Sequence, residues 1–244
     1  MRITFVSFFL LAFGLPTSAA TRDGIFSRLA TPIWSIARQP KGLASPDGLG
    51  IIHAVEVKSS ADDSWPFKTW VTRSGRSYRL PFGGFVSAEV AWSPDSSSFF
   101  VTYSDGGAVG QYHVLVYSID KAGLHSAEPI RNGSRLLRTI CFTPEDPNLG
   151  AIRWGTDSKS LLIAAEVPPH SNCALMGTFR AVEIAVPGGK VLKAYNQLEA
   201  KKVFGEILGI ELRNADDDCV KKPRSCVPPG LRLPISQRGE QGVP

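Results

Sequence analysis

Three times along the chain, a short polar turn is followed by an apolar run, a polar break and a second apolar run. The turns have the sequences Ser-Pro-Asp-Gly, Ser-Pro-Asp-Ser and Gly-Thr-Asp-Ser, at 45–48, 93–96 and 155–158. The apolar runs directly after them span 51–55, 99–103 and 161–165. Such repetition predicts stacked structural units, and short apolar runs bounded by turn residues predict that the units are built of β-strands.

The middle unit shows the expected strands most clearly. A short apolar strand over 90–92 precedes the turn, in which Pro94 and Asp95 stand where these residue types are favoured. Further strands are expected over 99–103 and 112–119, and a weaker fourth strand should follow the turn at 120–123. Because the other two units have the same order, the pattern predicts four antiparallel strands per unit, which is the blade of a β-propeller.

The segment after the repeats has the pattern of a helix. Asn196 and Glu199 have the spacing of a helix start, and apolar residues recur at helical spacing as far as Leu208. Gly209 would end this helix, and beyond Asp216 the chain is rich in proline and charge. The predicted fold class is mainly β: a partial β-propeller or a stack of three four-stranded antiparallel blades, with one C-terminal α-helix.

The predicted organisation has five parts. They are a signal peptide (1–20), an N-terminal lead-in (21–42), three β-blade repeats (43–194), a C-terminal helix (195–215) and a mostly irregular tail rich in Cys and Pro (216–244).

The first residues are typical of a secretory signal. Arg2 precedes an apolar stretch over 3–15, and the small residues of 16–20 predict cleavage after Ala19 or Ala20. The apolar stretch, at about 13 residues, is shorter than the ~20 that cross a bilayer. We therefore expect a secreted or periplasmic protein with no membrane span in the mature chain.

The charge balance does not point to nucleic acid. The chain carries 27 Lys and Arg against 22 Asp and Glu, a formal net charge of +5. The dense basic cluster of Lys221, Lys222 and Arg224 lies among prolines, where we expect a solvated tail. No nucleic-acid partner is expected.

Four cysteines in an exported chain predict disulfides, because disulfides persist in oxidising compartments. Four cysteines allow three connectivities, which the sequence leaves open. The spacing suggests Cys141 with Cys173, and Cys219 with Cys226. A zinc site is disfavoured because there is no C-x-x-C pair and no nearby pair of histidines.

The sequence has few patterns of catalytic or cofactor chemistry. It contains no G-x-S-x-G elbow, no phosphate-binding Gly loop followed by Lys and Ser or Thr, and no H-E-x-x-H helix. The acidic run 216–218 lacks the ligand spacing of a calcium loop. We therefore expect no catalytic, cofactor or metal residues. Asp47, Asp95 and Asp157 are interpreted as turn residues of the repeat, and Trp92 and Trp154 as its core residues.

The repeats resemble a known family. Trp92-Ser93-Pro94-Asp95, followed by an apolar strand and a later Gly-containing turn, is similar to the WD40-like repeat of TolB-type propellers. The segment 154–158 resembles a degenerate copy, and 45–48 keeps the turn without the Trp. The resemblance covers about 43–194 and implies an extracytoplasmic scaffold or binding module.

Propellers usually close with about 4 to 8 blades, and this chain has three recognisable units. An open stack leaves strand edges and apolar faces uncovered, which favours pairing with another chain. Two copies could form a six-bladed ring, a diverged fourth unit could lie in the termini, or a different element could cap the stack.

Two functions fit these observations. The first is an exported, non-catalytic scaffold or protein-interaction module that binds a protein partner, or associates with itself, through an open blade edge. The alternative is a propeller-type hydrolase or lyase, or an accessory domain of such an enzyme, with a site at the blade mouths. That site would need polar residues to converge there, such as Asp95, His113, Arg153 and Asp157.

Overall fold

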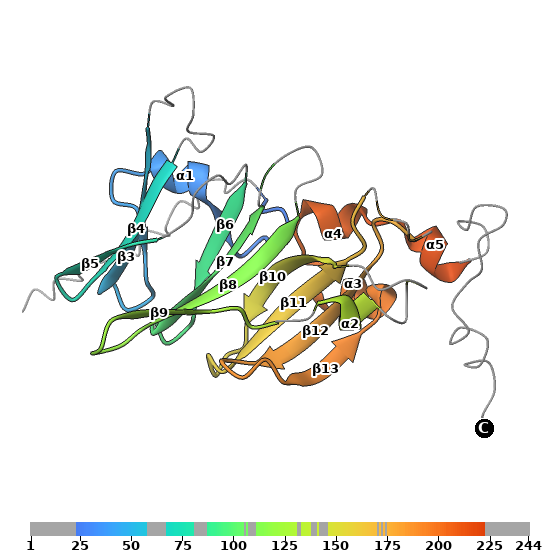
Figure 1. The fold of residues 1–244 in the computed structure, drawn as a ribbon. Helices are drawn as coiled ribbons and strands as arrows, with labels where there is room; N and C mark the ends of the chain where they lie inside the picture. The colour runs from blue at the N-terminus through green and yellow to red at the C-terminus, as the bar shows by residue number, and fades with distance from the viewer. Residues whose placement is uncertain are drawn as a thin grey trace, which may run out of the picture.

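The computed structural model of the 244-residue chain describes residues 23–57, 67–80, 87–104, 106, 111–130, 133–137, 141, 146–169, 171, 173 and 175–222. The described fold is mainly β, as the sequence predicts. It consists of three antiparallel sheets that stand side by side in a row, with one short helix beside the first sheet and the other described helices around the third (Figure 1). The predicted signal peptide lies outside the described residues.

Each sheet contains one predicted unit, with its strands in sequence order. The first sheet has β2 (Leu43–Ala44), β3 (Gly50–Glu56), β4 (Phe67–Arg73) and β5 (Arg76–Arg79). The second has β6 (Ala88–Trp92), β7 (Ser98–Ser104), β8 (Tyr112–Ile119) and β9 (Leu124–Ala127). The third has β10 (Asn148–Trp154), β11 (Ser160–Glu166), β12 (Phe179–Ala185) and β13 (Val191–Tyr195). The described sheets form an open row and no closed ring.

The predicted lead-in also contributes structure. Its strand β1 (Thr31–Pro32) pairs with β6 and makes the second sheet five-stranded. The helix α1 (Ile33–Ala37) follows directly, and α2 (Ser134–Leu137) lies between β9 and β10. At the end of the chain are α3 (Gln197–Phe204), α4 (Ile210–Asn214) and α5 (Asp217–Lys221).

The repeated turn has the same geometry in every unit. The residue after the aspartate takes a left-handed conformation, with φ of 70° at Gly48, 63° at Ser96 and 59° at Ser158. Glycine adopts this conformation at the lowest cost, so a serine there needs a compensating interaction. The aspartates at 47, 95 and 157 each accept a backbone N–H from two residues further on, at 3.0, 3.0 and 2.9 Å.

The two serines supply that compensation by joining neighbouring turns. Ser96 Oγ accepts the backbone N–H of Asp47, and Ser158 Oγ accepts that of Asp95, both at 3.0 Å. Each hydroxyl therefore ties the turn of one sheet to the turn of the sheet before it.

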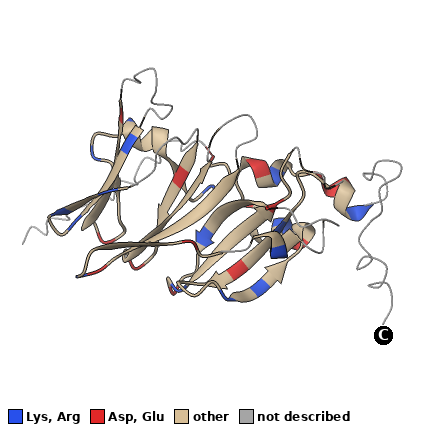
Figure 2. Ribbon diagram, viewed as in Figure 1, with Lys and Arg blue, Asp and Glu red and all other residues tan. Residues whose placement is uncertain are grey.

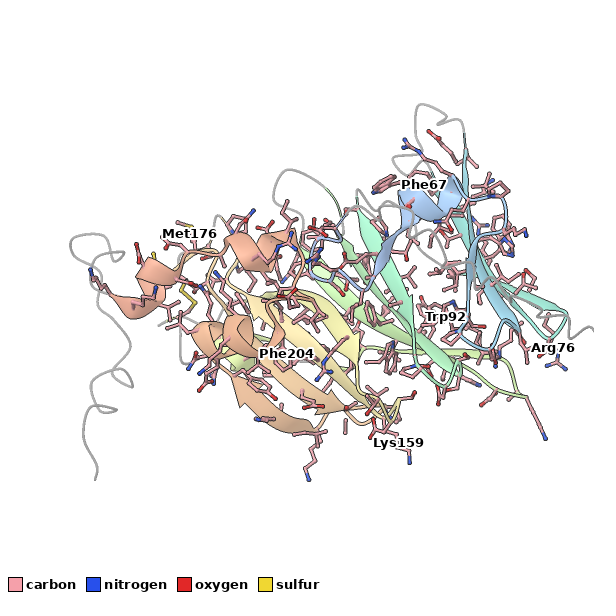
Figure 3. All side chains as sticks on the ribbon, turned by 180° about the vertical axis from the view of Figure 1, so that it is seen from behind. Phe67, Arg76, Trp92, Lys159, Met176 and Phe204 are labelled. Carbon is pink, nitrogen blue, oxygen red and sulfur yellow. A yellow bond between two sulfur atoms is a disulfide. The ribbon has the colours of Figure 1, made fainter. Side chains whose placement is uncertain are left out.

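The repeat tryptophans make a second recurring link. Trp92 Nε1 donates to the Leu43 carbonyl of the first sheet at 3.3 Å, and Trp154 Nε1 donates to the Ala91 carbonyl of the second at 3.2 Å. Figure 3 shows Trp92 between the first and second sheets, where its ring packs over Gly50. The indole thus combines apolar burial with a satisfied donor, as buried tryptophans usually do.

Apolar side chains fill the space between neighbouring sheets. Between the first and second sheets, α1 adds its buried face to the core of Ile33, Ile36, Ile52, Ala54, Val71, Val90, Phe99, Val101 and Tyr117. Between the second and third sheets, the core includes Phe100, Val114, Val116, Ala151, Trp154, Leu161, Ile163, Val182 and Ile184.

A cap covers the far face of the third sheet. It contains Phe26, Ala200, Phe204, Leu208 and Leu212, which pack on Ile152, Leu162, Ala164, Phe179 and Ala181 of the sheet. Figure 3 shows Phe204 between α3 and this sheet. The third way of completing the open stack, a capping element that follows the repeats, is therefore present at this end.

The helical part differs from the single helix predicted over 195–215. Asn196 and Glu199 form the expected capping box, but α3 ends at Phe204 and a second helix, α4, starts after Gly209. The cause is the N-terminal strap, which we define as residues 24–28. The strap forms backbone hydrogen bonds to the turn between the two helices. The backbone groups of this turn are therefore paired with the strap and do not extend α3. A further short helix, α5, begins at Asp217 in the tail that was predicted to be irregular.

Cys141 and Cys173 form a disulfide, the pairing that the spacing suggests. Cys219 is also disulfide-bonded, and its predicted partner Cys226 lies outside the described residues. Among the described helices, none is long and apolar enough to cross a bilayer.

The sheet-to-sheet contacts predict unequal effects of two tryptophan substitutions. Trp154, 7% exposed, is buried between two sheets, whereas Trp70 in β4 is half-buried on the side of the first sheet away from the second. We expect Trp154→Ala to lower the free energy of unfolding by about 3–5 kcal/mol, and Trp70→Ala by about 1 kcal/mol or less. Trp154→Phe, which keeps a ring but loses the Nε1 donor, should give an intermediate loss.

Denaturant unfolding of the oxidised protein measures these differences. An equal loss for Trp154→Ala and Trp70→Ala would contradict the stacking of the sheets described above.

Candidate functional site

The outer side of β3 is more accessible than the equivalent positions of the other two sheets. The strand alternates, so Ile52 and Ala54 face the second sheet while Ile51, His53 and Val55 face away from it. Counting from the repeated turn, the three outward positions correspond to Phe99, Val101 and Tyr103 in β7 and to Leu161, Ile163 and Ala165 in β11. In those strands the same positions pack against the preceding sheet.

The neighbouring strands extend this surface. Cross-strand pairing places Thr72 beside Ile51, Trp70 beside His53 and Lys68 beside Val55. In β5, Ser77 is paired with Thr72 and Arg79 with Trp70, so their side chains lie on the same side of the sheet. We call the surface formed by these side chains the first-sheet face: Ile51, His53, Val55, Lys68, Trp70, Thr72, Ser77 and Arg79.

The centre of the first-sheet face is aromatic and apolar. The rings of His53 and Trp70 are stacked, with centroids 5.2 Å apart and planes at 17°. Val55 is 47% exposed, and Leu49, at the near end of β3, is 65% exposed. His53 and Trp70 are half-buried beside them. Adjacent accessible apolar and aromatic side chains mark interaction surfaces more often than isolated ones do.

The first sheet lacks the two groups that join the other sheets to their predecessors. Ala44 stands where Trp92 and Trp154 stand, and Gly48 stands where Ser96 and Ser158 stand. The first sheet therefore has neither the indole donor nor the hydroxyl acceptor for a preceding sheet. Another copy of the same blade-to-blade contact cannot form on this side.

The charge on the first-sheet face is of one sign. Lys68 and Arg79 are exposed at its margin, and no Asp or Glu is among its residues. The described β4–β5 hairpin, residues 67–80, carries four Lys and Arg and no acidic residue. Figure 2 shows these basic residues on the two strands at the end of the row.

A groove adjoins the end of this hairpin. It has a volume of about 570 Å³ and is lined by the β4–β5 turn and the β8–β9 turn, including Arg73, Arg76 and Lys121. Arg73 is paired with Asp47 at 2.7 Å, and this pairing lowers the pKa of Asp47. Arg76, at the hairpin end in Figure 3, donates to the Lys121 carbonyl at 3.1 Å. These two arginines are therefore used to hold the hairpins together.

The four residues named for the enzyme alternative do not all come together: Asp95 and Asp157 lie in neighbouring turns that Ser158 joins, whereas His113 and Arg153 lie elsewhere. Asp95 and Asp157 lie in turns, where each carboxylate accepts backbone N–H groups of its own turn. His113 in β8 packs beside Tyr103, with ring centroids 5.4 Å apart. Arg153 lies on the opposite, capped side of the row, with its guanidinium 5.2 Å from the Phe204 ring.

Two glutamates are buried where the strap meets the sheets. Glu89 accepts the backbone N–H of Ile25 at 2.6 Å and of Phe26 at 3.1 Å. Burial raises the pKa of Glu89 to about 8, although the strap N–H groups act in the opposite direction. Burial also raises the pKa of Glu166 to about 8, against the Asn148 amide that donates to it, and the nearby Glu211 raises it further. Because these carboxyl groups are enclosed, we interpret them as structural.

Within the described residues, no group of three or more His, Cys, Asp or Glu side chains is arranged to hold a metal ion. Sequence reasoning missed the first-sheet face, although it noted that the first turn lacks the Trp. Comparing the three units position by position would have revealed it, since Ala44 and Gly48 are visible in the sequence.

Comparisons with known proteins add little. No protein-family model matches the sequence, and no curated protein matches it. Among solved structures, hydrazine synthase of Kuenenia stuttgartiensis aligns with 73% of this chain at 14% sequence identity and a TM-score of 0.34. The alignment covers 43% of that chain, and a likeness this weak carries no argument about fold or function.

Glu89 predicts a stability that falls at alkaline pH. An unfolded Glu has a pKa of about 4.3, so the folded protein binds this proton more tightly. The stabilisation is fully present below that value and is lost as the pH rises through about 8. Between pH 6 and pH 9, we expect a loss of roughly 2–3 kcal/mol from Glu89.

Urea unfolding at both pH values tests this expectation. Glu89→Gln removes the titrating group and should reduce the loss, whereas the exposed matched variant Glu206→Gln should not. An unchanged pH dependence in Glu89→Gln would show that Glu89 titrates normally.

Proposed function

We propose that this protein is an exported, non-catalytic β-sheet scaffold that binds a protein partner through the first-sheet face. The observation that carries the proposal is that the outer β3 positions of this face are more accessible than their equivalents in the second and third sheets, which pack against the preceding sheet. One end of the row is covered by the cap, and the opposite end exposes apolar and aromatic side chains. Accessible apolar and aromatic side chains gathered on one face are typical of a surface that binds another protein.

An extracytoplasmic location is part of the same proposal. It is supported by the apolar N-terminal stretch with its small-residue cleavage pattern. The Cys141–Cys173 disulfide is compatible with it, because disulfides persist in oxidising compartments.

We also propose that the three sheets are diverged WD40-like blades of the TolB type. The support is the turn repeated in all three units and the Trp repeated in two of them, which link sheet to sheet at equivalent atoms. An open row of such blades has a free end, which is where we place the partner.

Site-specific photo-crosslinking tests the proposed function. A photoreactive amino acid replaces Val55 on the first-sheet face or, as the matched control, Leu192 in β13, which is also exposed and apolar. The protein is exported by its source cell and irradiated. We expect one protein to be captured at Val55 and not at Leu192, and its yield to drop when Trp70→Ala is added.

Capture of the same protein at both positions, or capture at Leu192 alone, would show that the first-sheet face is not the binding surface. No capture at either position would argue against an interaction module.

A further inference from the structure

The first-sheet face is better suited to face-on docking than to pairing along its edge. The edge strand β5 has four residues, and two of them are Arg76 and Arg79. Short edge strands that carry charge disfavour the addition of another strand. The outward side chains of β3, β4 and β5 together form the face, so a partner can lie across the strands instead of adding to their edge.

The positive charge on this face is available to a partner. Lys68 and Arg79 form no ion pair with a described residue, in contrast to Arg73, which Asp47 neutralises. Both cations adjoin Trp70, because Arg79 is paired with it in β5 and Lys68 stands two residues before it in β4, while His53 stacks on its other side. A docking surface that complements the face must therefore be apolar at its centre and acidic at its margin.

Building on the proposed function, we infer that the partner of the first-sheet face is a different protein that presents an apolar surface flanked by Asp or Glu. Its apolar side chains cover the His53–Trp70 pair and Val55. Its carboxylates lie opposite Lys68 and Arg79.

A second copy of this chain is a poorer occupant. A two-fold dimer would place the first-sheet face against itself, and Lys68 and Arg79 would then meet the same cations with no acidic residue of the face between them. Like charges placed across an interface disfavour association. The opposite end of the row does not present a complementary sheet face, because the cap covers it.

Two helical peptides of about 20 residues serve as probes, a length at which helices begin to be stable in water. Both carry leucine along one side; the first has glutamate on the remaining positions and the second has lysine. Binding is followed by NMR through the indole N–H of Trp70 and the backbone amide of His53. We expect the glutamate peptide to shift both signals and to bind at least about tenfold more tightly than the lysine peptide at low salt, with a smaller ratio at high salt.

Charge reversal provides the sharp test. Lys68→Glu/Arg79→Glu should reverse the preference, so that the lysine peptide binds more tightly. The matched control Lys190→Glu/Lys193→Glu changes the net charge equally at exposed positions of the third unit and should leave the preference unchanged. All four substituted side chains of these variants are exposed, and an unchanged NMR signal dispersion verifies folding.

Equal binding of the two peptides, or reversal by the control variant, would overturn the inference. So would sedimentation showing a mass that grows with concentration and falls in Lys68→Glu/Arg79→Glu, because that result would identify a second copy as the occupant. The proposed function fails separately: it is contradicted when no protein is captured at Val55, whatever the charge preference of the peptides.

Discussion

An antiparallel sheet that is apolar on both sides must be covered on both sides, and this constraint determines the arrangement of the whole molecule. The second sheet meets it by packing between the first and the third. The third sheet needs a cover on its far side, which α3, α4 and Phe26 supply. The first sheet differs, because its outer side is apolar only around Ile51, Val55 and Trp70, and there the described residues end in an uncovered face. Because burial of apolar surface is the main favourable term in folding, an uncovered apolar patch of this kind is where the proposed partner would gain most by binding.

The cap depends on a junction between segments that are distant in the sequence. Phe26 lies against Gly150, where a side chain would leave no room: an added Cβ would come within 1.9 Å of the ring. The backbone on one side of Phe26 is held by the Glu89 carboxyl group, and Phe26 itself accepts the N–H of Gly209. The strap therefore connects the second sheet, the third sheet and the turn between α3 and α4. Its closing role explains why the buried Glu89 and the separation of the C-terminal helices both involve the strap.

The sequence predicted the strands well, because every unit repeats the same local signals. The turn with Asp at its third position, the apolar run and the capping box at Asn196 depend on neighbouring residues, and such signals are readable from one chain. It did not predict the division of the C-terminal helix, because that depends on hydrogen bonds from the strap, more than a hundred residues away. The first-sheet face was missed for a related reason. Ile51, His53 and Val55 form an ordinary alternating strand, and their accessibility depends on there being no sheet ahead of the first one among the described residues.

Two single positions separate the first unit from the others and specify where the row begins. Ser96 and Ser158 accept the strain of a left-handed backbone because their hydroxyl groups bind the preceding turn. At the equivalent position, the first unit has Gly48, which adopts the conformation without strain and offers no hydroxyl. A serine there would have carried the strain with no preceding turn to bind. Ala44 in place of Trp follows the same logic, since a large indole without a neighbouring sheet would be exposed. The first unit therefore lacks both groups by which the second and third sheets bind the sheet before them, and its outer side is suited to a contact of a different kind.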